Sequence, residues 1–373
     1  MKEEFTWSPS EDQIYSEKNV KKTIYPIHSF NKNFGKSFMM DPGDPKDQKK
    51  YTLTLSFNNP NSDNNPDDNY NYSIHWPIKS RILEPNESYK VYKSENTNET
   101  STGMINISSG DLIISGHKEY GVYFYLNPDP DIVEMSTIKL QKSGTLTIEN
   151  SVLVSLKGPI NPTVDMSGNS EFRIKKPENI ENIENTISLG NCYFSMTESS
   201  QATLESRQIT IDGSSIILQD NAQMFIIAPR LDITIPKDEK QSLLPLPSLT
   251  FTLKAGATSL NLNSPDGCNF PLDIDRKPPL DIDFPKGVFN FMAEGEENTG
   301  KVVIDVLPEY ANAYYGLNIM LRKNFIAINR KVVENGDQMK YFDFKYGKDI
   351  RGNKQVGTIT ISLRNPNLKL PSK

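Results

Sequence analysis

A short phrase that recurs at a fixed interval constrains this chain more than any other feature of its sequence. Residues 170–174, 192–196 and 214–218 each open with a small or polar residue and continue with apolar side chains at alternate positions. The phrases begin at 170, 192 and 214, so both intervals are 22 residues. About twenty residues per coil is typical of stacked β-solenoids. The sequence therefore predicts an all-β protein with a short β-solenoid, or β-helix-like segment, over residues 136–236.

Residue pairs suited to tight corners separate these phrases. Ser167-Gly168, Asp212-Gly213 and Asp220-Asn221 stand between apolar runs. Gly, Asn and Asp enter conformations with positive φ at low cost, which a coil needs at each corner. An antiparallel sandwich would also show short strands with turn residues between them, so that arrangement stays an alternative for this segment.

Residues 49–135, on the N-terminal side of this segment, predict a different β domain. Short stretches of alternating character, among them 51–57 and 120–126, are divided by turns rich in Asn, Pro, Asp and Ser. Repeated short strands with turn-rich gaps favour an antiparallel arrangement over a parallel sheet flanked by helices. We expect an antiparallel β domain here.

The C-terminal side begins with a Pro-rich linker at residues 237–248, where proline cannot continue a strand ladder. Residues 249–373 then contain several further strand patterns and predict a β-sandwich-like domain. Asn335-Gly336 lies between two of these patterns and predicts a hairpin, because Asn-Gly favours the two-residue turns that join antiparallel strands.

Residues 1–48 form an N-terminal arm in this interpretation. Ser10 is followed three positions later by Gln13, which fits a capping box and predicts a short helix through about Lys22. A terminal arm of this kind is usually a surface element, and docking on a neighbouring subunit is the alternative.

Charge and hydropathy exclude several classes of protein. The chain of 373 residues has 41 Lys and Arg against 47 Asp and Glu, a net charge of -6, and no basic stripe that could follow a phosphate backbone. We therefore expect no nucleic-acid partner. No apolar run is long enough to span a bilayer, and the acidic N-terminus is unlike a secretory signal. The expected location is cytoplasmic, or outside the cell by a non-classical route.

Motifs of standard enzyme chemistry are absent from the sequence. Three histidines lie apart from one another and from other metal-ligand residues, and no nucleophile elbow, phosphate loop or dinucleotide fingerprint occurs. The two cysteines, Cys192 and Cys268, fall in different segments and are expected to be buried free thiols. We expect neither a cofactor nor a metal site.

Two acidic patterns resemble ion sites but predict structural roles. Residues 63–67 alternate oxygen side chains as a calcium loop does, but the sixth position is Asp68 where that loop requires glycine. Residues 271–275 and 279–283 repeat the phrase Pro-Leu-Asp-Ile-Asp, with Arg276 and Lys277 between the copies to offset the carboxylates. A solvated turn and an edge strand are the expected structures.

One pair of carboxylates resembles an enzyme site. If coils repeat every 22 residues, Glu198 and Asp220 occupy equivalent positions on neighbouring coils, about 4.8 Å apart. Solenoid enzymes that cleave carbohydrates place acidic groups along one exposed face, where paired carboxylates act as acid and base. Glu198 and Asp220 are the catalytic candidates if the chain is an enzyme.

One group of aromatic residues is the candidate ligand surface. Tyr70, Tyr72 and Trp76 have the same parity within a strand-like segment, so a strand would place them on one side. Such a row can stack on sugar rings, and in a small β domain it also suits the core.

Taken together, these patterns favour a non-enzymatic structural or binding protein. It would assemble with itself as a homo-oligomer, or present a β surface to a glycan or protein partner, as an adhesion or carbohydrate-binding protein does. The alternative is a β-helix enzyme that degrades polysaccharides with the paired carboxylates. An oligomerising toxin is the third hypothesis.

Overall fold

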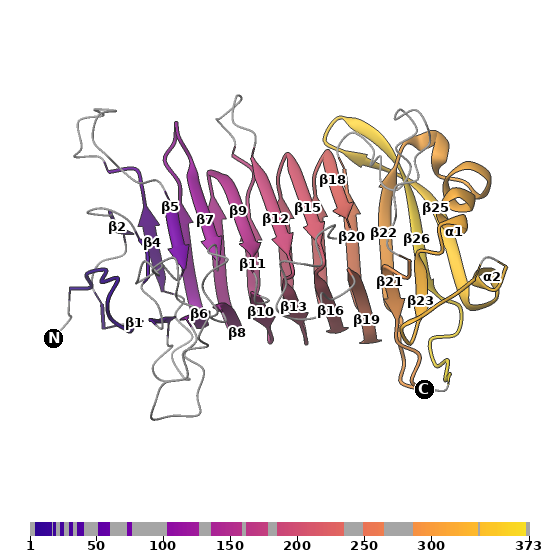
Figure 1. The fold of residues 1–373 in the computed structure, drawn as a ribbon, viewed down its shortest axis with the longest axis horizontal. Helices are drawn as coiled ribbons and strands as arrows, with labels where there is room; N and C mark the ends of the chain where they lie inside the picture. Colours follow the sequence, from indigo (N-terminus) through magenta and orange to yellow (C-terminus); the bar gives the residue numbers. More distant parts are fainter. Residues whose placement is uncertain are drawn as a thin grey trace, which may run out of the picture. The chain divides into compact units, whose positions relative to one another are not determined.

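A computed structural model describes most of the chain and is drawn in Figure 1. The described residues are 4–16, 18–19, 23–25, 30–32, 36–40, 51–59, 73–76, 103–126, 136–158, 162–177, 185–234, 249–264, 286–334 and 336–370. Nearly all of the regular structure among them is β, with short helical segments confined to residues 308–322 and 338–341. The all-β prediction is confirmed. None of the helices in the described ranges is long and apolar enough to cross a membrane.

The described residues divide into two compact units along the chain. The first contains the described residues up to Tyr193, and the second contains those from Phe194 onward. This division does not test the boundaries expected at residues 136 and 236, which stay predictions.

The first unit is built from parallel strand ladders. Its strands are β1 (Gln13–Tyr15), β2 (Thr23–Ile24), β3 (Phe38–Met40), β4 (Thr52–Ser56), β5 (Ser73–Trp76), β6 (Gly103–Ser115), β7 (Val122–Leu126), β8 (Ser136–Glu149), β9 (Ser151–Lys157), β10 (Thr163–Met166), β11 (Glu171–Ile174) and β12 (Thr186–Gly190). One sheet pairs β4 with β6 and β6 with β8, and then β8 with both β10 and β11. A second sheet pairs β5, β7, β9 and β12 in order. Every one of these pairings is parallel.

Alternation along each strand places the core of this unit between its sheets. Successive side chains of a strand point to opposite faces, so every second apolar residue is directed inward. In-register pairing then stacks like residues on one another, as where Leu112 of β6 lies against Leu146 of β8. The fully buried apolar side chains of β6 to β9 are Ile105, Ile107, Leu112, Ile114, Val122, Phe124, Leu126, Ile138, Leu140, Leu146, Ile148, Val154 and Leu156.

The second unit continues with strands of the same kind. They are β14 (Gln201–Glu205), β15 (Gln208–Asp212), β16 (Ser215–Asp220), β17 (Gln223–Ile227), β18 (Arg230–Thr234), β19 (Thr250–Gly256), β20 (Ser259–Asn263), β21 (Phe289–Phe291), β22 (Lys301–Val306) and β23 (Ile326–Ile328), with β13 (Tyr193–Met196) where the chain passes from one unit to the other. Parallel ladders join β14, β17, β20 and β22, and likewise β16, β19, β21 and β23. β15 pairs with β18.

The 22-residue spacing is the pairing interval of two parallel ladders within this unit. Gln201 lies opposite Gln223, and Gln208 lies opposite Arg230, so two different faces repeat at the same interval. Parallel ladders between strands one repeat apart are the arrangement that the solenoid prediction requires. The antiparallel alternative for this segment does not agree with these pairings.

Antiparallel strands close the end of these ladders. β26 (Lys354–Leu363) pairs antiparallel with β22, and β25 (Phe342–Arg351) pairs with β26 along its whole length. The short β24 (Lys331–Val332) pairs antiparallel with β23. Helical segments η2 (Pro308–Tyr310), η3 (Ala313–Leu317), α1 (Asn318–Arg322) and α2 (Gln338–Tyr341) lie in the connections. The C-terminal region therefore combines parallel ladders with an antiparallel cap (Figure 1).

Strand direction in the first flanking region differs from the prediction. The described strands between residues 49 and 135 pair in parallel, whereas an antiparallel domain was expected. Alternation with a period of two occurs in both kinds of sheet and does not fix direction. The pairing partners lie 50 or more residues apart, as with Ser73 and Tyr123, so no short hairpin signal could reveal them.

The register expected for the first phrase is also wrong. Glu171 of β11 pairs with Thr145 of β8, while Tyr193 donates its backbone N–H to the carbonyl oxygen of Pro162, 2.9 Å away, beside β10. Phrases 170–174 and 192–196 therefore do not lie in equivalent positions on neighbouring coils. Two similar strands follow one another in each repeat, as β10 and β11 do and as β13 and β14 do, and β10 pairs with β13 while β11 pairs with β14. The phrase at 170–174 therefore belongs to the second strand of one repeat, and the phrase at 192–196 belongs to the first strand of the next.

The N-terminal helix is wrong as well. Among the described residues of this segment the structure has β1 where the helix was expected. The amide oxygen of Gln13 accepts from Ser8 N at 2.8 Å and from Lys32 Nζ at 2.7 Å, and its amide nitrogen donates to Thr6 O at 2.7 Å. The side chain expected to cap a helix instead holds a loop onto the buried Lys32, whose ammonium group also lies 4.5 Å from the centre of the Trp7 ring.

The predicted Asn335-Gly336 hairpin does not form as expected. Gly336 lies in a turn that leads into α2, and Asn335 is outside the described residues. The long hairpin of this region is instead β25–β26, where Arg351 pairs with Lys354 across a two-residue loop that begins with Gly352. Gly352 has φ of 59°, which suits glycine at this position.

Candidate functional site

The structure brings Glu198 and Asp220 together at one corner of the second unit. Asn221 N donates to Glu198 O at 2.7 Å, and Glu198 N donates to the Asp220 carboxylate at 3.1 Å. Both residues have positive φ, 58° and 61°, because each one turns the chain between two strands of a coil. Their adjacency is as predicted, while the Asp220 carboxylate also serves as an acceptor that holds the corner.

The close approach of backbones continues to the next coil. Gly256 pairs with Asp220 in the β16–β19 ladder, and a Cβ added to Gly256 would lie 2.2 Å from the Asp220 carbonyl oxygen. The corner positions therefore stack directly on one another. No group of three or more His, Cys, Asp or Glu side chains suited to a metal ion occurs in the described ranges.

One aromatic candidate, Trp76, has a different position from the one expected of a ligand surface. Trp76 is fully buried on β5, and its ring packs edge-on against Trp7 with centroids 5.6 Å apart. This corresponds to the core role that the sequence also allowed. Tyr70 and Tyr72 lie outside the described residues.

An outward-facing aromatic cluster lies on the opposite face of the same strand. We call His75, Tyr123 and Tyr125 the aromatic cluster. His75 of β5 pairs with Tyr125 of β7 in the parallel ladder, and their rings stack with centroids 4.7 Å apart and planes 13° from parallel. Tyr123, two residues before Tyr125 on the same face, is 39% exposed. The ladder continues to Leu153 and Ser155 of β9.

Burial keeps the two stacked rings uncharged near neutral pH. Burial lowers the pKa of the His75 imidazole below its usual value of 6.5. It raises the pKa of the Tyr125 phenol above 10.0, with a smaller contribution from Tyr123. Two neutral rings beside one exposed tyrosine present a surface with π faces and hydrogen-bonding tips, but no net charge.

One pattern in the sequence indicates this cluster. Tyr123 and Tyr125 alternate with the apolar Val122, Phe124 and Leu126, which are the buried side chains of β7. Two aromatic residues at the strand positions that alternate with buried apolar residues indicate an exposed aromatic face. Their contact with His75 could not be predicted, since it depends on a pairing across 50 residues.

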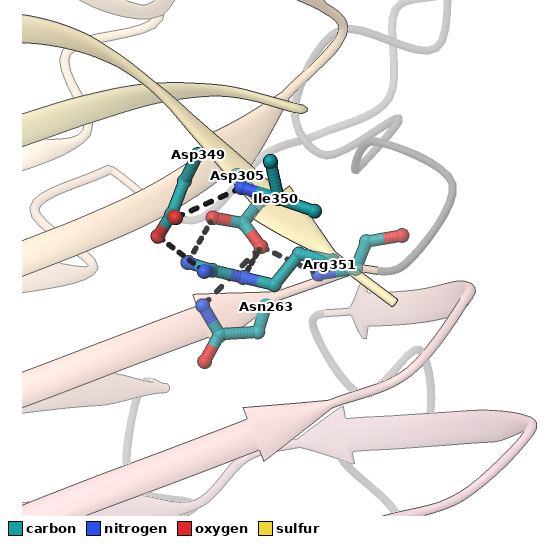
Figure 2. Close-up of polar contacts among 6 residues, drawn as sticks. Asn263, Asp305, Asp349, Ile350 and Arg351 are labelled. Atoms are coloured by element: carbon teal, nitrogen blue, oxygen red, sulfur yellow. Dashed lines mark hydrogen bonds and ion pairs between the residues drawn. The ribbon is translucent and has the colours of Figure 1, made fainter. Parts of the chain in front are cut away.

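A buried ion pair with several further hydrogen bonds lies in the second unit. Asp305 of β22 has no exposed surface, and its carboxylate accepts from Arg351 Nε at 2.9 Å and Arg351 Nη2 at 3.1 Å. Asn263 Nδ2 and Ser264 N donate to the same carboxylate at 3.2 and 3.0 Å. Figure 2 shows Arg351 between Asp305 and Asp349, which also binds its guanidinium group.

This cluster fixes the β25–β26 hairpin onto β22. The guanidinium group comes from the last residue of β25, and the buried carboxylate comes from the next-to-last residue of β22. Hydrogen bonds to Ile350 N and Arg351 lower the pKa of the Asp349 carboxyl, so it stays ionised beside Arg351. Because all of these donors and acceptors bind one another, the cluster acts as a structural clamp.

Cys192 is a buried free thiol, as expected. Burial raises the pKa of its thiol to about 12. The thiolate is the reactive form of cysteine, so this side chain has no nucleophilic character at neutral pH. Cys268 and the acidic segments 63–67, 271–275 and 279–283 lie outside the described residues.

The comparisons with known proteins leave the family open. No family model, no curated protein and no solved structure matches the chain.

Proposed function

We propose that this chain is a non-enzymatic binding protein that presents the outer face of β5, β7 and β9 to a glycan. The observation that carries the proposal is the aromatic cluster. Stacked and exposed aromatic rings on the outer face of a sheet suit the apolar faces of sugar rings, while their polar tips suit sugar hydroxyls.

The surroundings of the cluster favour a neutral glycan. The ladder of β5, β7, β9 and β12 continues outward from His75 and Tyr125 to Ser155 and Ser188. Hydroxyl groups at successive strand positions, 4.7–4.9 Å apart in a sheet, offer repeated donors and acceptors. A row of this kind suits an extended polymer better than a small enclosed ligand.

A binding assay with matched tyrosine variants tests the proposal. The wild type should bind one or more polymers in a panel of neutral and acidic polysaccharides, measured by affinity electrophoresis. Tyr123→Ala and Tyr125→Ala should each weaken that binding by about 0.5–1.5 kcal/mol, the value of one aromatic contact. Tyr193→Ala is the matched control, because Tyr193 is also 39% exposed but lies outside the cluster. Equal loss in all three variants, or no binding to any polymer, would contradict the proposal.

The alternative function is polysaccharide cleavage, which the adjacency of Glu198 and Asp220 favours. Its test uses Glu198→Gln with Asp220→Asn, because Asn keeps an oxygen for Glu198 N and tolerates positive φ. If the wild type releases reducing sugars from a bound polymer and this variant does not, the protein is an enzyme. Release by neither protein, with binding retained, supports the binding function.

A further inference from the structure

β25 has one edge that no strand covers in the described part of the chain. It pairs along its whole length with β26, and side chains on both of its faces are exposed near its end. Ile350 is 70% exposed and Tyr346 is 40% exposed. An open edge of this length presents unpaired backbone N–H and C=O groups that can bind another strand.

The hydrogen-bond pattern shows which residues face this open edge. Arg364 N donates to Tyr341 O at 2.9 Å, so odd-numbered residues at this end of β25 direct their backbone groups toward β26. Even-numbered residues, among them Tyr346 and Lys348, therefore direct theirs outward. Ile350 N agrees with this pattern, since it donates to the side chain of Asp349 at 2.8 Å.

We propose that two copies of this chain form a dimer by antiparallel pairing of β25 with β25, on a twofold axis through Gly347. A twofold axis perpendicular to the sheet keeps each residue on its own face, so the two numbers of every opposed pair sum to an even value. Few registers remain under this condition, and the charges of β25 distinguish among them.

The register centred on Gly347 opposes unlike charges. It places Lys345 against Asp349 of the second copy, twice by symmetry, and the Asp349 side chain is 53% exposed. Asp343 comes opposite Arg351 of the second copy, but these two side chains already bind Arg364 and Asp305 in their own chain, so the charge argument depends on Lys345 and Asp349. On the other face it opposes Phe344 to Ile350. Opposite charges and paired apolar side chains across strands each stabilise a sheet.

The neighbouring registers oppose like charges instead. Centring the axis on Tyr346 places Asp343 against Asp349, and centring it on Lys348 places that residue against itself. Centres at Lys345 and Asp349 also oppose identical charges. Charged residues on edge strands usually prevent association. Axes through Phe344 or Ile350 also oppose unlike charges, but they pair only five and three residues of β25. The Gly347 register therefore joins the longest stretch of β25 without opposing like charges.

This inference does not depend on the proposed glycan binding, since β25 and the aromatic cluster belong to different units. It names the surface for the homo-oligomer that the sequence led us to expect. The two proposals can fail separately, because one is measured by glycan affinity and the other by molar mass.

The test is the molar mass by light scattering and sedimentation, from about 1 µM to about 1 mM protein. The wild type should reach a dimer within this range. Lys345→Glu should weaken dimerisation by about tenfold or more, because two attractive pairs become repulsive. Lys348→Pro should do the same by removing an outward N–H, while Lys348→Thr, which keeps that N–H, should still dimerise.

Mixing two variants tests the register itself. Lys345→Glu and Asp349→Lys should each be monomeric alone, and an equal mixture should form the dimer again, since both opposed pairs then carry unlike charges. A monomeric wild type across the range would overturn the proposal. So would a dimer that Lys348→Pro leaves unchanged, or a mixture that stays monomeric while the wild type dimerises.

Discussion

Replacing Arg351 with Met should destabilise the second unit by about 3 kcal/mol. Asp305 has no exposed surface, and the substitution removes two of the four hydrogen bonds to its carboxylate. Removing one partner of a buried ion pair costs about 3–5 kcal/mol. The lower value applies because Asn263 and Ser264 still donate to the carboxylate, and the Arg351 side chain is 27% exposed.

A double variant separates the buried charge from the lost contacts. In Asp305→Asn with Arg351→Met, the amide oxygen can keep the bonds from Asn263 and Ser264 while no charge stays buried. We expect this variant to be more stable than Arg351→Met alone by about 1–2 kcal/mol.

Hydrogen exchange of amides in β22 and β26, combined with urea unfolding, measures this effect in the second unit. Both tryptophans of the chain, Trp7 and Trp76, lie in the first unit. The urea midpoint that their fluorescence reports is therefore an internal control, and it should be the same in the variant and the wild type. Stability of Arg351→Met within about 0.5 kcal/mol of wild type would refute the reasoning.

Two further predictions concern corners and pH. Gly256→Ala should lower the free energy of unfolding by about 3 kcal/mol or more, because φ is 105° and the new Cβ would meet Asp220 O. Gly352→Ala is the control: its φ is 59° and its surroundings are open, so it should cost about 1 kcal/mol in the same urea titration. Burial lowers the pKa values of His75 and His117, so the unfolded chain takes up protons first as pH falls. Stability of the first unit should be complete above about pH 6.5 and decrease below it. His75→Phe, which keeps a ring on Tyr125, should flatten that decrease in tryptophan-monitored melting between about pH 7.5 and pH 5, and an unchanged profile would exclude His75 as its cause.

Much of the fold could be predicted because alternation and turn chemistry are local. The strand patterns at 51–57 and 120–126 correspond to β4 and β7, and the corner residues Gly168 and Asp220 do have positive φ. Strand direction could not be predicted in the same way, since both kinds of sheet alternate with a period of two. The helix from Ser10 was wrong because a capping box is a local preference, which tertiary contacts override.

The candidate sites could likewise be predicted only where a regular interval in the sequence brings their residues together. Glu198 and Asp220 were found because they lie one regular coil apart, so a single interval was enough. Asp305 and Arg351 lie 46 residues apart, across an irregular cap that no interval describes. The sequence carried no signal for that pair.

Parity rather than residue type decides which aromatic side chains of a parallel ladder are available to a ligand. Trp76 and His75 are neighbours in the chain, yet the first is fully buried and the second stacks on Tyr125 at the outer face. A shift of one residue in the expected strand exchanges these roles. Because residues paired in a ladder lie on the same face of the sheet, an error in one strand passes to every strand paired with it. Aromatic residues on the outer face of two paired strands, as at His75 of β5 and Tyr125 of β7, are therefore better evidence for a binding face than an aromatic row within one strand.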